Sequence, residues 1–212
     1  MANNKFHTQY KVNNNRVPSV TTIIGNLGWN KNALIAWAKN TAAEGNDPDK
    51  IRDEAADIGT LTHKMVEDHI KGLTTNTFMN SQSDIEKASV GYNAFLMWEE
   101  ANSPTYLESE VKLVSNLYNY GGTIDLVVEL NGKKGILDIK TSKGIYPDHI
   151  LQLAAYRNMY AEVSEKVSFC SIIKLDKVNG GFEYHDISGD RLDYAFEAFL
   201  HCLALHNLKG KI

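Results

Sequence analysis

The sequence predicts an α/β protein in which one mixed sheet is flanked by helices, and three observations lead to this fold class. An Asn-Gly dipeptide at residues 131–132 separates two runs rich in Val, Ile and Leu. Apolar residues with helical periodicity dominate the chain before these runs and return after them. Strand-like segments near 167–175 and 181–186 follow. The predicted order is therefore helices, a three-strand meander, a helix and returning strands.

The first part of the chain is expected to be mainly helical. Ser19 is placed to cap a short helix that ends at Gly28. The apolar residues of this helix have the i, i+3, i+4, i+7 spacing of a face that packs into a core: Val20, Ile23, Ile24 and Leu27. Three longer helices are predicted at 31–44, 49–71 and 82–101.

The Asn-Gly pair sets the register of the central hairpin. Both residues tolerate the positive φ angles of a two-residue type I′ turn between antiparallel strands near 121–130 and 134–140. This register places Glu129 opposite Lys134, an opposite-charge pair, and Asp125 opposite Asp138. Lys140 falls on the same face as the two aspartates. The other face is a continuous apolar surface that must pack against something: Ile124, Leu126, Val128, Leu137 and Ile139.

Two adjacent carboxylates in an apolar hairpin need compensation, because burying a charge costs several kcal/mol. A divalent cation with a preference for hard oxygen ligands, Mg²⁺ or Mn²⁺, would supply it. Lys140 would then act as a point charge beside a phosphate or a metal-bound water. The alternative from the hairpin alone is a solvated surface on which Lys140 forms a salt bridge with one aspartate.

The segments after the hairpin complete the fold. A strand near 106–114 precedes the hairpin, and a helix near 147–162 follows it with Gln152 and Tyr156 on one face by i, i+4 spacing. A closing helix begins near residue 189. Its apolar stripe predicts packing and no other role: Leu192, Ala195, Phe196, Phe199, Leu200 and Leu203.

Length and composition agree with one domain, residues 1–212, with a mainly helical part at 1–104 and the sheet with its flanking helices at 105–212. A chain of 212 residues with 43% hydrophobic content can bury one sizeable core. A polar N-terminal segment predicts no secretory signal, and no apolar run approaches the length of about 18 residues that a membrane span needs. We therefore expect a soluble, intracellular protein without a membrane partner.

Charge and cysteine content narrow the class of ligand. The net charge of −4 argues mildly against a large nonspecific nucleic-acid surface. Several basic residues nevertheless fall in the half of the chain that carries the aspartate pair: Lys133, Lys134, Lys140, Lys143, Arg157, Lys174 and Lys177. The two cysteines, Cys170 and Cys202, are expected to be buried thiols, and two cysteines cannot hold an iron–sulfur cluster on four.

Five motifs resemble one known family. They are "VPSVTTIIGNLGWNKNALIAWA" from Val17, "GTLTHKMVEDHIKG" from Gly59, "GTIDLVV" from Gly122, "DIK" from Asp138 and "QLAAYR" from Gln152. Together they resemble the RecB-like branch of the PD-(D/E)XK nuclease superfamily, close to phage exonucleases and the mitochondrial genome maintenance exonuclease. The resemblance covers most of the chain and implies a restriction-endonuclease-like αβββαβ core.

The resemblance also implies site residues. Asp125, Asp138, the backbone carbonyl of Ile139 and His63 would hold one or two Mg²⁺ or Mn²⁺ ions, and Lys140 would orient the attacking water. Without the resemblance, a lone histidine on a helical face with Gly59 and Glu67 is more often a packing or surface residue than a metal ligand. Gln152 and Tyr156 would lie near the scissile phosphate or brace the lysine. Glu110 is a further candidate for a metal or water-positioning role. No small-molecule cofactor is implied.

The implied activity is that of a metal-dependent deoxyribonuclease that leaves 5′-phosphates. We expect an exonuclease on DNA with free, preferably single-stranded, ends, because the exonucleases that this chain resembles thread a strand beneath N-terminal helices. Trp29, Trp37 and Tyr118 are candidates for stacking on bases.

Several alternatives stay open on the sequence alone. They are a structure-specific endonuclease, a catalytically silent nucleic-acid-binding member of the fold, and a structural or partner-binding protein. DNA against RNA, polarity, oligomeric state and the number of metal ions also stay open. The expected location is the cytoplasm of a bacterium or of a phage-infected host cell, with recombination or replication proteins as candidate partners.

Overall fold

The computed structural model describes residues 8–212, so the predicted polar N-terminal segment lies partly outside the described residues. At its centre is a five-stranded mixed sheet with the order β3-β4-β5-β6-β7, which confirms the predicted fold class. The first three strands form an antiparallel meander, β5 and β6 are parallel, and β7 is antiparallel to β6. The strands are β3 (Thr105–Ser115), β4 (Tyr120–Leu130), β5 (Lys133–Lys140), β6 (Phe169–Leu175) and β7 (Phe182–Asp186).

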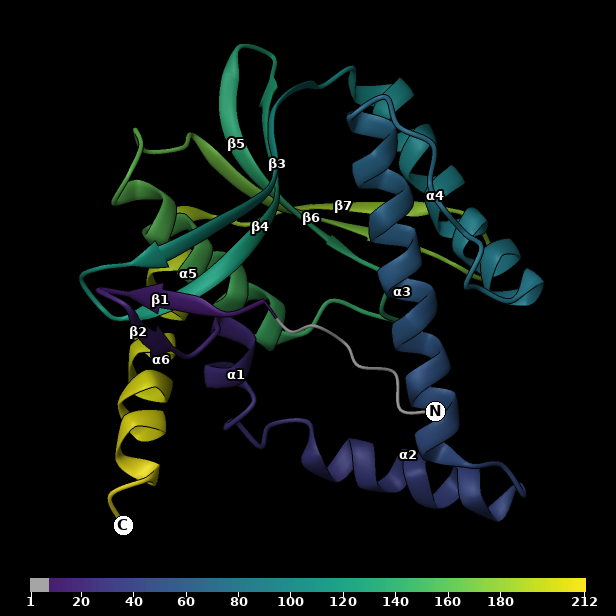
Figure 1. Cartoon of the computed structure of the whole chain (residues 1–212), viewed down its shortest axis with the longest axis horizontal. Helices are drawn as coiled ribbons and strands as arrows, with labels where there is room; N and C mark the ends of the chain where they lie inside the picture. Colours follow the sequence, from purple (N-terminus) through teal and green to yellow (C-terminus); the bar gives the residue numbers. More distant parts are fainter. Residues whose placement is uncertain (1–7) are drawn as a thin grey trace.

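Helices cover both faces of this sheet (Figure 1). One face packs against α3 and α4, and the other against α1, α5 and α6. α2 lies apart from the sheet and contacts α3. Because α4 precedes the meander and α5 joins β5 to β6, the chain contains the expected αβββαβ order. The helices are α1 (Val20–Ile24), α2 (Lys31–Ala43), α3 (Pro48–Ile70), α4 (Gln82–Asn102), α5 (Pro147–Ala161) and α6 (Gly189–Lys209).

Two parts of the hydrophobic core pack against the sheet, one on each face, and a third, smaller cluster lies between α3 and α4. Tyr120 and Phe199 belong to the part under α1, α5 and α6, and Phe95 and Trp98 belong to the part under α3 and α4. Strands β4 and β5 contribute fully buried side chains to both parts. A charged side chain on either strand therefore needs a specific partner, because burial of an unpaired charge is costly.

The central hairpin has the predicted register. Asn131 and Gly132 have φ angles of 52° and 73°, as a type I′ turn requires. Glu129 pairs with Lys134, although the Lys134 Nζ donates to Ser164 Oγ at 3.2 Å and lies over the Tyr160 ring rather than contacting Glu129. The ladder ends at Leu126↔Leu137. Asp125 and Asp138 thus follow directly after its last pair.

Two features of the apolar pattern differ from the prediction. Ile124 packs with Tyr120 on the α5 face and not with Leu126, because the alternation of side chains is interrupted around Asp125. The helix capped by Ser19 ends at Ile24 instead of continuing to Gly28, because the Gly25 N–H already closes its last turn by donating to Thr21 and Ile23.

A two-stranded hairpin at the N-terminal end of the described chain was not predicted. It consists of β1 (Tyr10–Val12) and β2 (Asn15–Val17) and turns at Asn13 and Asn14, both with positive φ. The strands are too short for a periodic signal. The sequence signal that identifies them is the Asn-Asn pair, because asparagine tolerates the left-handed conformation of such a turn.

None of the helices within residues 8–212 combines the length and the apolar character that crossing a membrane requires.

Candidate active site

Three side chains from three elements converge at the α3 side of the sheet. His63 comes from α3, Glu110 from β3 and Asp125 from β4. One ligand atom from each lies within 4.8 Å of the others, and the His63 Nδ1 is 3.8 Å from the Asp125 Oδ1. Among the described residues this is the one group of three or more His, Cys, Asp or Glu side chains with such spacing.

An irregularity in the backbone of β3 and a glycine in α3 help to bring these three side chains together. The β3–β4 register shifts by one residue between Tyr106 and Glu108, and Glu110 has a φ of 52°. A positive φ is unusual for a glutamate in a strand, and backbone strain of this kind is concentrated at turns and ligand sites. On α3, Gly59 gives His63 its approach to the sheet, because a Cβ at Gly59 would lie 2.8 Å from the Thr141 Oγ1.

The electrostatics of the group favour a cation. Burial, together with the charge of Asp125, raises the pKa of Glu110 to about 7. Burial lowers the pKa of His63, opposed by the neighbouring Asp125 carboxylate, so the imidazole tends to be neutral and able to act as a ligand. In the metal-free protein the two carboxylates repel each other, and a bound cation would relieve this repulsion.

A second group lies beside the first and includes the predicted lysine. Asp138 is fully buried, and the Lys140 Nζ is 2.6 Å from its Oδ2. The Lys140 Nζ also donates to the Gln152 Oε1 at 3.0 Å, and the Gln152 Nε2 donates to the Tyr156 Oη at 2.8 Å. Burial raises the pKa of Asp138, while the Lys140 ammonium opposes this effect.

The two groups meet at the end of the hairpin. The Ile139 N–H donates to the Asp125 Oδ2 at 2.7 Å, so a backbone group next to Asp138 fixes the Asp125 carboxylate. His63, Glu110, Asp125 and Ile139 line one small void. Of the remaining predicted site residues, Asp138, Lys140, Gln152 and Tyr156 form the second group. The structure thus places all the predicted site residues around one end of the hairpin, in two adjoining groups.

Neighbouring residues have more ordinary roles. Glu67 lines the void, but its carboxylate forms ion pairs with Lys64 and Lys71. His69 points elsewhere, toward Glu99 and Tyr92.

A single divalent ion fits the donor set. The void has a volume of about 10 Å³, close to that of one water-sized sphere, and is too small for an organic cofactor. An imidazole nitrogen and carboxylate oxygens are acceptable ligands for Mg²⁺ and Mn²⁺. The buried Asp138 Oδ1 has no hydrogen-bond partner among the described residues, as expected for an oxygen available to a cation. Site residues and void are therefore compatible with the predicted metal.

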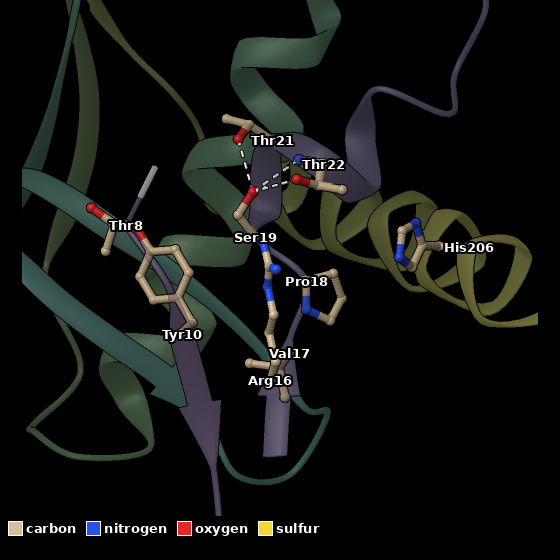
Figure 2. A pocket seen from close by; sticks show the side chains of 9 residues that line it. All are labelled: Thr8, Tyr10, Arg16, Val17, Pro18, Ser19, Thr21, Thr22 and His206. Carbon is tan, nitrogen blue, oxygen red and sulfur yellow. Dashed lines mark hydrogen bonds between the residues drawn. The ribbon is translucent and has the colours of Figure 1, made fainter. Parts of the chain in front are cut away.

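A much larger cavity of about 850 Å³ is lined by residues of the β1–β2 hairpin, of α1 and of α6 (Figure 2). The described residues that line it include no acidic side chain: Thr8, Tyr10, Arg16, Val17, Pro18, Ser19, Thr21, Thr22 and His206. The side chain of Arg16 extends from β2 in the direction of Ser19 (Figure 2).

Tyr10 connects this cavity to the carboxylates. Its ring lines the cavity, and its hydroxyl is 2.8 Å from the Thr123 Oγ1, two residues before Asp125. The charge of Glu110 contributes to the raised pKa of Tyr10, after the larger effect of burial. Sequence reasoning did not identify Tyr10 or Arg16 as site residues, because both belong to the hairpin that it missed.

Comparisons with known proteins give remote likenesses. No family model and no curated protein matches the sequence. Among solved structures, a candidate exonuclease from Eubacterium rectale is 12% identical with a TM-score of 0.49, over 73% of this chain and 69% of that one. LHK-Exo in complex with dAMP is 14% identical with a TM-score of 0.43, over 74% and 86%. A second structure of LHK-Exo, an alkaline exonuclease from Laribacter hongkongensis, has 14% identity and a TM-score of 0.36, over 74% and 89%.

Proposed function

We propose that this protein is a Mg²⁺- or Mn²⁺-dependent DNA nuclease whose active site is formed by the two groups at the end of the β4–β5 hairpin. The observation that carries the proposal is the convergence of His63, Glu110 and Asp125 around an ion-sized void, directly beside the buried Asp138–Lys140 pair. Carboxylates next to a lysine are the groups needed to hold a cation and a phosphate together.

Each residue has a role that follows from its contacts. His63, Glu110 and Asp125, with Asp138 and the Ile139 carbonyl, would hold the ion. A divalent cation bound there supplies positive charge to the scissile phosphate and lowers the pKa of a bound water. The Lys140 ammonium, held by Gln152, donates hydrogen bonds to the attacking water or to a phosphate oxygen.

The bond changes follow from in-line attack at phosphorus. The water oxygen forms a new bond to phosphorus and loses its proton, and the bond from phosphorus to the 3′-oxygen breaks. The 3′-oxygen leaves and takes up a proton. The phosphate stays on the 5′-oxygen of the downstream nucleotide, so the products carry 5′-phosphates.

The large cavity supports a nucleic-acid substrate. A phosphodiester backbone needs cationic and hydroxyl donors and is repelled by carboxylates. Arg16, Ser19 and the hydroxyls of Thr21 and Thr22 supply such donors, and the lining includes no acidic side chain among the described residues. In a chain with a net charge of −4, such a surface is a distinct local feature. We place the strand that continues from the scissile phosphate in this cavity.

The position of α2 supports a preference for single-stranded ends. The Asn30 Nδ2, just before α2, donates to the Asp148 Oδ2 at 3.4 Å at the start of α5, while α2 itself contacts α3. The segment from Asn30 through α2 thus extends from α5, which carries Gln152, to α3, which carries His63 (Figure 1). It has no acidic residue from Lys31 to Ala43, and the Trp29 side chain is 55% exposed. A basic segment with an exposed aromatic ring suits unpaired bases.

Tyr118 does not lie near Trp29 and α2. Its ring packs edge-on against Phe196 with centroids 5.6 Å apart, on the α6 side of the molecule. Of the three aromatic residues considered for stacking, Trp29 is therefore the strongest candidate, and Trp37 is half-buried.

Digestion of end-labelled linear and closed circular DNA, each single- and double-stranded, tests this function. With Mg²⁺ or Mn²⁺ we expect linear single strands to be shortened from their ends to products with 5′-phosphates, and circles to resist. EDTA and Asp125→Ala should each abolish cutting. Circles cut as fast as linear strands would indicate an endonuclease. Binding without cutting under all metal conditions would indicate a silent member of the fold, and activity that persists in EDTA would contradict the metal site.

A further inference from the structure

A pair of glycines in β4 lies against two tyrosine rings. A Cβ built on Gly121 would lie 2.3 Å from the Tyr10 Cγ, and a Cβ on Gly122 would lie 2.6 Å from the Tyr156 Cε1. Both distances are shorter than real Cβ atoms show. Neither glycine has a positive φ, so the close approach of the rings, rather than backbone conformation, requires glycine here.

The ring on Gly122 belongs to the group that holds Lys140. The Tyr156 Oη accepts a hydrogen bond from Gln152, and the Gln152 Oε1 accepts one from the Lys140 Nζ. The same Nζ contacts Asp138 at 2.6 Å. The position of the lysine is therefore connected through two hydrogen bonds to the position of the Tyr156 ring.

The Tyr156 ring has little freedom to move elsewhere. Tyr156 is 4% exposed and lies in the core on the α5 face of the sheet. A Cβ on Gly122 would also lie 3.3 Å from the Met159 Cε, one helical turn along α5. The Tyr156 ring thus packs directly on the backbone of Gly122.

We propose that Gly122 is a positioning residue for the nuclease reaction. Because Gly122 has no side chain, the Tyr156 ring can pack directly on the backbone of β4, and this contact fixes the position of the Tyr156 hydroxyl. The hydroxyl in turn fixes Gln152, and Gln152 fixes the Lys140 ammonium. This inference rests on the proposed function of Lys140, but it concerns a residue that lines neither the void nor the large cavity.

The size of the expected displacement supports this role. To restore an ordinary contact of 3.4 Å from 2.6 Å, the ring or the strand must move by roughly 0.8 Å. The usual donor–acceptor range of a hydrogen bond spans about 0.5 Å. A shift of that size breaks or stretches the bond between Tyr156 and Gln152, and a misplacement of about 1 Å at a reacting group can reduce a rate by about 100-fold.

The first test is Gly122→Ala with Gly135→Ala as its matched control. Gly135 lies on the neighbouring strand β5, and its Cβ would meet the Phe169 ring at 2.2 Å, a comparable clash remote from Lys140. We expect Gly122→Ala to lower kcat per folded molecule by about 10- to 100-fold with KM changed less than about threefold. Gly135→Ala should lose stability but keep the wild-type kcat.

A double-mutant cycle with Tyr156→Phe separates positioning from general destabilisation. Phenylalanine keeps the ring and its clash but has no hydroxyl, so the connection to Gln152 is already absent. Gly122→Ala should then lower kcat by less than about threefold in the Tyr156→Phe background. A loss of the same size in both backgrounds would show that Gly122 acts through the fold, and the proposal would be wrong.

A readout without substrate keeps this inference separate from the nuclease function. Acetylation of Lys140 by an N-hydroxysuccinimide ester, followed by mass spectrometry, reports how well the ammonium is held and covered. We expect Gly122→Ala to speed acetylation of Lys140 by about threefold or more relative to other lysines, and Gly135→Ala to leave it unchanged. If the wild type cuts no DNA, this difference still supports the positioning role. Equal acetylation in the wild type and both variants would overturn it.

Discussion

Glu110 has two features that destabilise the metal-free protein, and a bound cation would offset the second of them, the repulsion between carboxylates. Its φ of 52° lies in a region that costs a non-glycine residue roughly 1–3 kcal/mol, and its carboxyl lies beside that of Asp125. Proteins keep strain and like-charge proximity of this kind mainly at functional sites. At the scale of single residues, Glu110 is therefore the observation that most strongly supports our proposal that a ligand binds at the cluster with His63.

Glu110→Gln should stabilise the metal-free protein at neutral and alkaline pH. The folded pKa of about 7 lies above the ordinary value of 4.5, so the folded state retains a proton that the unfolded chain has lost between these values. Stability therefore falls as pH rises through this window and stays low above it. We expect a gain of about 1–2 kcal/mol at pH 8 and almost none at pH 4, from denaturant titrations in EDTA.

The same Glu110→Gln variant should lose most of the stabilisation that Mn²⁺ gives the wild type, because binding to the folded state raises its stability. A variant that is less stable than the wild type at pH 8 in EDTA would mean that the Glu110 carboxylate has a favourable partner.

Lys140→Ala should separate folding from catalysis. Removal of the lysine leaves Asp138 buried without its cation, and breaking a buried pair in this way costs about 3–5 kcal/mol before the aspartate takes up a proton. We expect lower stability at pH 8 than at pH 5, where protonation of Asp138 relieves the cost. Adding Asp138→Asn should restore part of the stability without restoring nuclease activity. Activity in the double variant would remove Lys140 from the mechanism.

Among the elements, α2 differs most from its neighbours. It is rich in alanine and also carries Leu34, Ile35 and Trp37, yet its single buried residue is Thr41. A helix usually gains most of its stability from packing of an apolar face. This element therefore contributes little to the core, and its exposed residues would be available to a strand that enters the proposed active site.

Trp29→Ala should weaken binding of single-stranded oligonucleotides without affecting the fold. Stacking of one base on an aromatic ring contributes about 1–3 kcal/mol, so the expected loss is roughly 5- to 150-fold in affinity. The melting temperature should not change, because the side chain is 55% exposed. Fluorescence anisotropy in EDTA measures the affinity. Phe78→Ala is the control, since Phe78 is an aromatic residue that is 89% exposed between α3 and α4. Equal losses in both variants would exclude a specific role for Trp29.

The elements that the sequence predicted well are those with strong local signals. The helices from Lys31 onward and the strands of the sheet were located by periodicity, and Asn131 with Gly132 fixed the hairpin register. The β1–β2 hairpin was not predicted, because strands of three residues are too short to show an alternation of apolar and polar side chains. The position of Ile124 and the backbone of Glu110 could not be predicted, because the interruption at Asp125 arises from tertiary contacts of β3, α3 and the end of β5.

The site was likewise predictable only in part. Asp125, Asp138 and Lys140 could be placed together from the turn alone, because the side-chain period of a strand is two. The sequence did not predict that the site residues form two groups, one around the void and one around Lys140. This arrangement depends on burial and on contacts of Gly59, Gly122 and Tyr156 with distant parts of the chain. Arg16 and Tyr10 were missed with their hairpin.

For the whole molecule, the distribution of charge matters more than its sum. The net charge is −4, yet the large cavity has Arg16 and no acidic residue among the described ones that line it. A nucleic-acid strand in this cavity, as we propose, would meet the Arg16 guanidinium and no described acidic side chain of the lining. Tyr10 is the residue that relates this cavity to the carboxylates that would hold the metal, because its ring lines the cavity and its hydroxyl is 2.8 Å from the Thr123 Oγ1, two residues before Asp125.

Arg16→Ala should reduce the salt dependence of DNA binding. Each phosphate contact with a cationic side chain contributes about 0.7 to the slope of log K against log salt for single strands. We expect this slope to fall by about that amount in Arg16→Ala and not in Arg52→Ala, whose guanidinium already pairs with Asp49 and Asp53 on the surface of α3. An unchanged slope in Arg16→Ala would place the strand outside this cavity.

Titration of Mn²⁺ into the metal-free protein, followed by electron paramagnetic resonance, measures whether the cluster of His63, Glu110 and Asp125 binds a metal ion. We expect saturable binding, weakened roughly 10- to 100-fold by His63→Ala and at least as strongly by Asp125→Asn. His201→Ala, which changes an exposed histidine on α6, should bind like the wild type. Equal affinity in the wild type, His63→Ala and Asp125→Asn, or no binding by the wild type, would contradict a metal-dependent active site at His63, Glu110 and Asp125.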